Sequence, residues 1–329
     1  MTNANATDSS FAGIDVSKHK LDLARTGIRE VAAFSNDPAG IAQLVEELRK
    51  CPPTLIVVEA TGGLEGPLLQ ALLEADLPVA LANPRHVHYF ALSLGIKAKT
   101  DPIDAHVIER YAAQLSPRLL QKRSEKQTEL EALVTCRRQL LHLRTEQTNR
   151  LGQTSSKSAR KSIQAVLKTL EKQLKLLESQ IRKLIESDDD MDNIDKLLRS
   201  VPGIGQVASA TLLCEMSELG SMDRRQAAAL MGVAPFNRDS GKSRGKRAIR
   251  GGRASVRSVL YMSAVCAIRF NPIVRAFAQR LQKAGKLPKV IIVAAMRKLT
   301  CIINAMVRDG LRWDQLDIVK NFQAVKNVA

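Results

Sequence analysis

The segment between Glu125 and Ser187 constrains the fold of this chain most, because it contains almost no glycine or proline. Both residues interrupt helices, so the segment predicts long helices. The stretch GQTSSKSARKS, residues 152–162, indicates a break or a bend between two of them. In the second, large aliphatic residues recur at alternating steps of three and four, which is a heptad pattern: Leu167, Leu170, Leu174, Leu177, Ile181 and Leu184.

Two interpretations of this helical arm remain open. The arm could be an antiparallel hairpin that packs on itself, or a coiled coil that pairs two protomers, and we favour the second. The acidic stretch ESDDDMDN then ends the arm as a linker. The chain of 329 residues thereby divides into a flexible tail (1–9), an N-terminal domain (10–122), the arm (123–192) and a C-terminal domain (193–329).

Short apolar runs alternate with helical patterns before the arm, which predicts an α/β domain. Expected strands lie in FAGIDVSKHKLDLART (two strands with a turn at 17–20), EVAAFSND, TLIVVEATGG and PVALANP. Expected helices are PAGIAQLVEELRK, LEGPLLQALLEAD and DPIDAHVIERYAAQ. The segment RHVHYF, residues 85–90, also looks strand-like.

The C-terminal domain is predicted to be mainly helical. Residues 194–216 indicate a helix, a tight turn and a second helix, and two apolar helices follow near 254–270 and 289–307. Gly203 and Gly205 in SVPGIG allow a turn whose N–H groups could grip a phosphate, as in a helix–hairpin–helix module. The alternative is an ordinary connection between helices.

A net charge of +17 and a pI near 9.9 indicate a polyanionic partner, and nucleic acid is the commonest. Aromatic residues make up only 3% of the chain, which favours backbone contacts over base stacking. No run of about 18 apolar residues and no signal-peptide core occurs, so we expect a cytoplasmic protein without a membrane partner. The five scattered cysteines are expected to be reduced.

Four acidic residues occupy positions where an ionised carboxylate is unfavourable unless a partner or a cation is nearby. Asp15 and Glu59 lie within apolar strand patterns, and an ionised group there is costly unless it is paired or bound to metal. Asp101 and Asp104 are three residues apart on a predicted helix and share one face. Acids on the first strand, a central strand and a later helix are typical of RNase H-like nucleases, where they hold Mg²⁺ or Mn²⁺.

A basic, glycine-rich segment follows Asn237 and predicts an adaptable phosphate-binding loop. Its cations are Arg238, Lys242, Arg244, Lys246, Arg247, Arg250, Arg253 and Arg257. Ser240 lies among them, with Ser243, Ser255 and Ser258 as rivals for the role of a nucleophile. A serine hydroxyl needs activation, and the local sequence offers no obvious base.

Six motifs in this order resemble the DEDD transposases of insertion-sequence family 110, which include bridge-RNA-guided recombinases and Piv-type DNA invertases. They are GIDVSK, VVEATGG, KTDPIDA, SVPGIG, FNRDSG and RSVLYM. The resemblance extends from about Phe11 to about Arg312. It implies a RuvC-like first domain with Asp15, Glu59, Asp101 and Asp104 as a metal-binding tetrad, a coiled-coil arm, and a C-terminal transposase domain in which Ser240 is the nucleophile.

The resemblance further implies an RNA-guided site-specific recombinase of an insertion sequence. Its partners would be donor and target double-stranded DNA and a noncoding guide RNA encoded by the element. The active site would be composite, with the serine of one protomer meeting the acids of another in a tetramer, a dimer of dimers. A phosphoserine intermediate would preserve the phosphodiester energy. In the cell such a protein would associate with the nucleoid.

Three alternatives remain. The first is a metal-dependent nuclease like a Holliday-junction resolvase, in which Ser240 only contacts phosphate. The second is a DNA invertase that uses no guide RNA. The third is an architectural nucleic-acid-binding protein, which does not explain acids in apolar strands.

Overall fold

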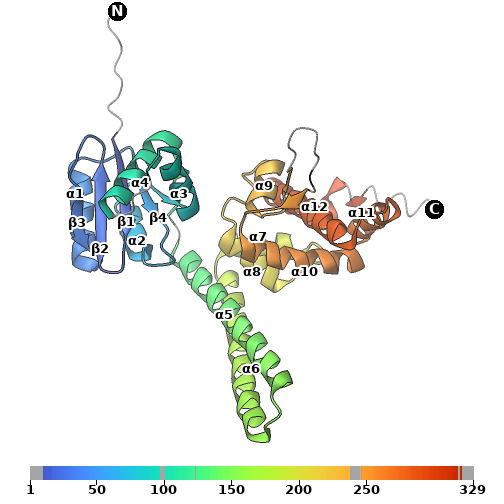
Figure 1. Ribbon diagram of the computed structural model, residues 1–329. Coiled ribbons are helices and arrows are strands. Elements are labelled where there is room, and N and C mark those ends of the chain that lie inside the picture. The colour runs from blue at the N-terminus through green and yellow to red at the C-terminus, as the bar shows by residue number, and fades with distance from the viewer. Residues whose placement is uncertain are drawn as a thin grey trace, which may run out of the picture. The chain divides into compact units, whose positions relative to one another are not determined.

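The computed structural model describes residues 10–96, 101–122, 124–237, 245, 247–317 and 319–320, with the backbone but not the side chain of Asp101 (Figure 1). The predicted tail of residues 1–9 lies outside this set. The chain divides into two compact units, residues 1–122 and 123–329. Each unit is described by itself.

The first unit is built on a mixed five-stranded sheet, as expected for an RNase H-like fold. Its order is β3-β2-β1-β4-β5. Strand β1 pairs antiparallel with β2 and parallel with β4, β2 pairs antiparallel with β3, and β4 pairs parallel with β5. The strands are β1 (Phe11–Val16), β2 (Lys20–Arg25), β3 (Ala32–Ser35), β4 (Leu55–Glu59) and β5 (Val79–Ala82).

Two helices cover each face of this sheet. Helices α1 (Pro38–Lys50) and α2 (Gly66–Glu74) pack on the face that carries Ile14. Helices α3 (Pro84–Ser93) and α4 (Asp101–Leu115) pack on the opposite face, where Val57 lies. The strand-like interpretation of residues 85–90 was wrong: the Asn83 side chain accepts a hydrogen bond from the Arg85 N–H and Pro84 occupies the first turn, so the segment starts a helix.

The second unit begins with the helical arm, in which α5 (Glu125–Gln153) and α6 (Lys157–Glu186) lie side by side within one chain (Figure 1). Leu174, Leu177 and Ile181 of the heptad seam are buried, whereas Leu167 and Leu170 are half-buried. Arg160 closes the turn by donating to the carbonyls of Leu151 and Thr154 at 2.7 and 2.9 Å. The hairpin interpretation thus describes the pairing within the chain, and pairing between protomers stays a prediction.

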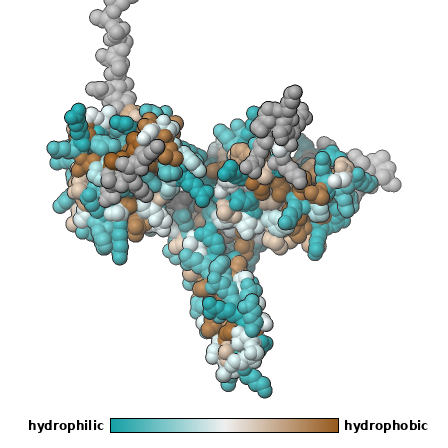
Figure 2. Space-filling model, in the orientation of Figure 1, coloured by the Kyte–Doolittle hydropathy of each residue, from teal (hydrophilic) through white to brown (hydrophobic). Residues whose placement is uncertain are grey.

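Hydrophilic residues cover most of the arm that is visible in Figure 2. The large apolar side chains exposed on it are Leu143, Val166 and Leu176.

The acidic stretch after the arm is not a linker. Asp188 caps α7 (Asp189–Arg199) by accepting from the Met191 N–H at 3.1 Å, and three acids occupy the first turn. Acids at a helix N-terminus are favourable because they face the positive end of the helix dipole.

Helices surround one core in the rest of the second unit. They are α7, α8 (Gln206–Glu215), α9 (Arg224–Leu230), α10 (Ala254–Phe270), α11 (Pro272–Lys283) and α12 (Pro288–Asp309), with a short 3-10 turn η1 (Trp313–Gln315). Strands β6 (Pro235–Phe236) and β7 (Ala248–Ile249) form a small hairpin. Helix α12 is long and apolar enough to cross a membrane by composition, but Ala295, Leu299 and Ile303 of α12 are buried in this core.

Candidate active site

Asp15 lies near the end of β1, half-buried, on the face of the sheet that α4 covers. Its partner across the antiparallel ladder is Asp22 of β2. Its side chain shares a face with Gly13, two residues earlier, because side chains alternate along a strand. The apolar neighbour Ile14 points to the opposite face, into the core under α1 and α2. Strand alternation therefore brings an acid to the α4 face without disturbing the main core.

Glu59 ends β4 beside Asp15. The parallel ladder between β1 and β4 pairs Ile14 with Val58, so the next residue of each strand, Asp15 and Glu59, continues the same register. Paired residues of neighbouring strands point to the same face. Two of the four predicted acids thus lie next to each other at the carboxyl ends of adjacent parallel strands, the edge where open α/β sheets bind ligands.

The loop after Glu59 is held by a second acid, Glu65. One of its oxygens accepts hydrogen bonds from the Thr61 N–H at 3.1 Å, the Thr61 hydroxyl at 2.7 Å and the Gly63 N–H at 2.9 Å. Burial of this carboxyl raises its pKa, but the hydrogen bonds from Thr61 and the backbone outweigh burial, and the net pKa is lowered. Gly62 and Gly63 have φ of 86° and 126°, which suits glycine. Glu65 therefore fixes the backbone that follows Glu59.

Helix α4 brings Asp101 and Asp104 toward the same edge. It crosses β1 at Gly13, where an added Cβ would lie 2.2 Å from the Glu109 nitrogen. The Glu109 side chain accepts from Thr26, which pairs with Phe11 at the start of β1, and after α4 the Leu120 N–H donates to the Val79 carbonyl at the start of β5. The helix therefore runs antiparallel to β1. One helical turn rises about as far as two strand residues, roughly 6 Å, so the first turn of α4 lies near Asp15.

The donor set suits a hard divalent cation, since it consists of carboxylates and no thiolate or imidazole is required. Within the part of the chain that the structure describes, no three Asp, Glu, His or Cys side chains form a group that could hold a metal ion. The side chain of Asp101 lies outside that part. The described geometry thus places Asp15, Glu59 and the first turn of α4 at one edge, and the metal-binding tetrad itself stays a prediction.

Sequence reasoning missed Asp22. This carboxylate is only 2% exposed and faces Asp15 across the ladder. The Lys20 ammonium lies 2.6 Å from it, with the lysine side chain 43% exposed. Lysine and aspartate alternate with leucine in KLDLAR, and this period of two was the available sign that both point to the α4 face. The site edge therefore holds a lysine beside the acids.

The predicted basic loop is the loop of the β6–β7 hairpin. Pro235 pairs with Ile249 and Phe236 with Ala248, so residues 237–247 connect the two strands. Its base is tight: Gly232 and Gly252 have φ of 69° and 68°, and a Cβ on Gly252 would lie 2.3 Å from the Gly232 nitrogen. The predicted nucleophile and four predicted contacts lie outside the described residues: Ser240, Arg238, Lys242, Arg244 and Lys246.

The remaining predicted cations differ in their surroundings. Arg247 and Arg250 are exposed. The Arg253 guanidinium makes two hydrogen bonds to the buried carboxylate of Glu218, at 2.7 and 2.8 Å. Arg257 donates to the Gly251 carbonyl. Arg253 and Arg257 therefore stabilise the base of the hairpin, and their contacts with nucleic acid stay predictions.

Ser255, one rival of Ser240, donates a hydrogen bond to Glu215. Glu215 is also paired with Arg138 of the arm at 3.1 Å. Ser258, the other described rival, lines the same cavity of about 360 Å³ between the arm and helices α7, α8 and α10. A carboxylate next to Ser255 could act as a base, so both serines are relevant to the test of the nucleophile.

The two glycines of the predicted phosphate-binding turn have different roles. Gly203 has a φ of 114°, and a Cβ there would lie 2.7 Å from the Ala267 side chain of α10. Close packing against α10 therefore explains Gly203. Gly205 is exposed at the N-terminus of α8, where no side chain caps the helix. Of the two, Gly205 has the surroundings that phosphate binding needs.

Comparison with known protein families matches both units. Residues 12–154 match the DEDD transposases of the IS110 type, described as "Transposase". Residues 195–279 match a family described as "Transposase IS116/IS110/IS902 family".

Individual relatives extend these matches along nearly the whole chain. The pilin gene-inverting proteins of Moraxella bovis and Moraxella lacunata are each 30% identical over 321 residues, which cover 93% of this chain and 98% of the relative. A protein of insertion element IS110 from Streptomyces coelicolor is 29% identical over 119 residues, 36% of this chain and 29% of the relative.

Proposed function

Because this chain belongs to the IS110 family of DEDD transposases, we propose that it is a site-specific recombinase of an insertion sequence that cuts and rejoins donor and target DNA. Members of this family are transposases and DNA invertases, so the chain is an enzyme that acts on DNA. The observation that carries the proposal is the shared edge of Asp15, Glu59 and the first turn of α4 in an RNase H-like unit.

Asp15, Glu59, Asp101 and Asp104 would hold Mg²⁺ or Mn²⁺ at this edge. A bound ion would stabilise negative charge on the scissile phosphate and favour the ionised form of an attacking hydroxyl. Glu65 would keep the end of β4 in place through its bonds to Thr61 and Gly63. Lys20 would supply a positive charge beside the acids.

We assign the nucleophile to Ser240. Its Oγ would form a bond to phosphorus while the bond from phosphorus to the 3′-oxygen breaks. The serine gives up its proton, and the departing 3′-oxygen takes one up. Rejoining reverses the step on a new partner, because a free 3′-hydroxyl attacks the phosphoserine and restores the hydroxyl of Ser240. Along the chain, Ser240 falls in the basic segment between β6 and β7, and phosphate contacts of that segment would bring DNA to it, which supports this role.

Guidance by a noncoding RNA and assembly into a tetramer belong to the same proposal. The family resemblance and the net charge of +17 support the RNA partner. Exposed Leu143, Val166 and Leu176 on the arm offer apolar surface for pairing protomers. The protein would work in the cytoplasm, on nucleoid DNA.

A second candidate function is DNA inversion without a guide RNA. The inversion part of this function is favoured by the Moraxella relatives, pilin gene-inverting proteins that match along 98% of their length. Sequencing of nucleic acid that copurifies with the full chain separates the two. An enriched noncoding RNA from the flank of the gene supports guidance, whereas purified protein that recombines DNA without any RNA supports inversion alone.

The test of the recombinase is strand transfer by the full chain on a supercoiled plasmid carrying both element ends, in Mg²⁺. Asp15→Asn and Glu59→Gln should each abolish strand transfer, while Glu74→Gln, an exposed acid of α2, should leave it intact. Strand cleavage without rejoining by the unchanged protein would instead support the nuclease. No strand transfer and no cleavage by the unchanged protein would leave only an architectural role, and normal strand transfer by both acid variants would contradict the role assigned to the acids.

A further inference from the structure

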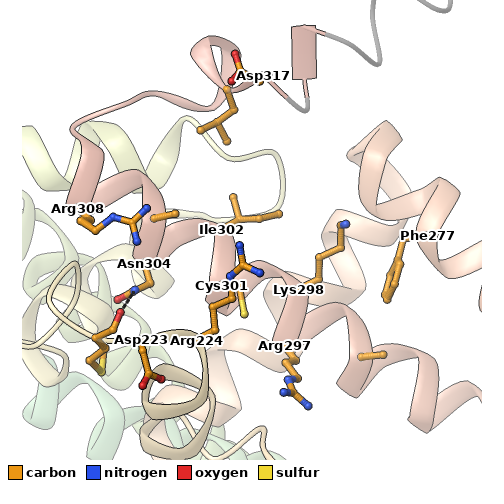
Figure 3. A pocket seen from close by; sticks show the side chains of 14 residues that line it. Asp223, Arg224, Phe277, Arg297, Lys298, Cys301, Ile302, Asn304, Arg308 and Asp317 are labelled. Atoms are coloured by element: carbon orange, nitrogen blue, oxygen red, sulfur yellow. Dashed lines mark hydrogen bonds between the residues drawn. The ribbon is translucent and has the colours of Figure 1, made fainter.

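A second cavity lies in the helical part of the second unit, away from the β6–β7 hairpin. It has a volume of about 770 Å³ and is lined by α9, α11, α12 and residues around η1 (Figure 3). None of the described residues that line it belongs to β6, β7 or the start of α10. The proposed catalytic chemistry therefore does not account for it.

Small side chains on one face of α12 create the cavity. Ala294, Cys301 and Ala305 are separated by seven and four residues, which places them on the same side of a helix. Leu299 and Ile303 of α12 point into the core instead, whereas Ile302 lines the cavity. The space is therefore a consequence of the sequence of α12.

Four cations surround these small residues: Arg224, Arg297, Lys298 and Arg308. Arg308 is paired with Asp309 at 2.8 Å. Among the residues that the structure describes, the other three form no ion pair. Two acids also line the cavity. The carboxylate of Asp223 already accepts from the N–H groups of Arg225 and Gln226, and Asp317 lies at the opposite end of the view from Arg297 (Figure 3).

The walls are held in place by specific contacts. Asn304, which is 4% exposed, donates to the Met222 carbonyl at 2.7 Å and accepts from the Gly220 N–H at 2.9 Å. These bonds attach the start of α9, and thus Arg224, to α12. On the other side, the Lys298 ammonium lies 5.1 Å from the centre of the Phe277 ring (Figure 3). Arg297, Lys298 and Arg308 therefore belong to α12, which also carries the small residues, and Arg224 is held opposite them at the start of α9.

We propose that this cavity is a phosphodiester-binding site, which seats a short segment of nucleic-acid backbone outside the catalytic centre. The proposal rests on the recombinase function, because it assumes a nucleic-acid partner. Three cations around a groove can neutralise successive phosphates, and the small residues of α12 let the backbone approach. Lys298 and Arg280 both lie over the Phe277 ring, at 5.1 and 5.5 Å from its centre, so a base could stack there only by displacing a cation.

Charge favours a nucleic acid over an acidic peptide. Arg275, Arg280 and Lys283 are exposed along α11, next to the cavity, and extend its positive surface. The cavity also has apolar lining, from Phe277, Ile302 and Leu316, so the preference for a nucleic acid rests on the charge and not on the lining. DNA and RNA share the chemistry that this groove recognises, so the experiment uses both.

The test is the salt dependence of binding by the full chain to a random 30-base-pair DNA duplex and, separately, to an RNA hairpin. We expect the triple variant Arg224→Gln/Arg297→Gln/Lys298→Gln to reduce the slope of log K against log salt by about three, roughly one per phosphate contact. The matched control Lys168→Gln/Lys172→Gln/Lys175→Gln removes the same charge from exposed positions of α6 and should change the slope by less than about one. A third variant, Ala305→Trp, fills the cavity without changing charge and should also weaken binding.

Each outcome decides the proposal. A reduced slope for the duplex, the hairpin or both supports it and identifies the nucleic acid. An unchanged slope for both, an equal reduction in the α6 control, or full binding by Ala305→Trp contradicts it, and an unchanged slope leaves the acidic peptide as the occupant. Circular dichroism of each variant excludes loss of folding. Asp15→Asn keeps the slope but should lose strand transfer, so failure here and failure of the proposed function are distinguishable.

Discussion

Asp22 and Lys20 form the least expected pair in the first unit, since a buried carboxylate faces another carboxylate across the ladder. A buried acid is tolerated only when it is paired. The ammonium of Lys20 provides that partner and remains hydrated because its side chain is 43% exposed. The pair therefore stabilises the fold at the proposed metal-binding edge.

Removal of the lysine should be measurably destabilising. Lys20→Met leaves Asp22 buried without its ammonium, next to Asp15, and we expect a loss of about 2 kcal/mol in the free energy of unfolding, less than for a fully buried pair. Lys18→Met, in the exposed turn between β1 and β2, should stay within about 0.5 kcal/mol. Urea unfolding of the full chain, followed through the first unit by hydrogen exchange, measures both. If Lys20→Met and Lys18→Met reduced the free energy of unfolding equally, the ion pair between Lys20 and Asp22 would not stabilise the first unit.

At the scale of elements, the hairpin that carries Ser240 depends on two glycines at its base. A Cβ on Gly252 would lie 2.3 Å from the Gly232 backbone nitrogen, and its φ is 68°. Gly251 has a similar φ of 72°, but a Cβ there meets nothing within 4 Å. A substitution at Gly251 therefore tests backbone strain alone, and one at Gly252 tests strain together with steric overlap.

Gly252→Ala should destabilise the second unit by about 2–4 kcal/mol, because strain and overlap add. Gly251→Ala should cost about 1–2 kcal/mol from strain alone. Thermal unfolding measures which of the two variants is less stable. Strand transfer should also fall further for Gly252→Ala, because the base of the hairpin moves. If both variants behave alike, close packing of Gly232 and Gly252 does not anchor the loop.

Elements with strong periodicity could be predicted from the sequence, and elements set by local caps could not. The helix at 38–50 and the two long helices of the arm followed from spacing and from the lack of glycine. Helix α3 was missed because its Asn83–Pro84 start follows a strand directly. The first turn of α7 was interpreted as a linker because a run of acids is also typical of an exposed connection, and here it caps a helix. Strands of two residues, such as β6 and β7, have no detectable period.

At the scale of the whole molecule, the candidate acids could be selected from the sequence, but the residues that lie beside them could not. Asp15 and Glu59 stood out as acids in apolar strands, but only the register shows that they adjoin and that Asp22 faces Asp15. The positive charge predicted a polyanionic partner. It did not separate cations that pair internally, such as Arg253 with Glu218, from those that line the cavity beside α12.

The central claim is that a serine of the β6–β7 hairpin loop attacks DNA with help from the acids of the first unit. The most direct measurement traps the covalent adduct on a nicked suicide duplex in Mg²⁺ and locates the modified peptide by mass spectrometry. We predict a phosphate-linked nucleotide on Ser240, absent in Ser240→Ala and in Asp15→Asn. An adduct on Ser255 or Ser258, or strand cleavage with no adduct, would contradict this account.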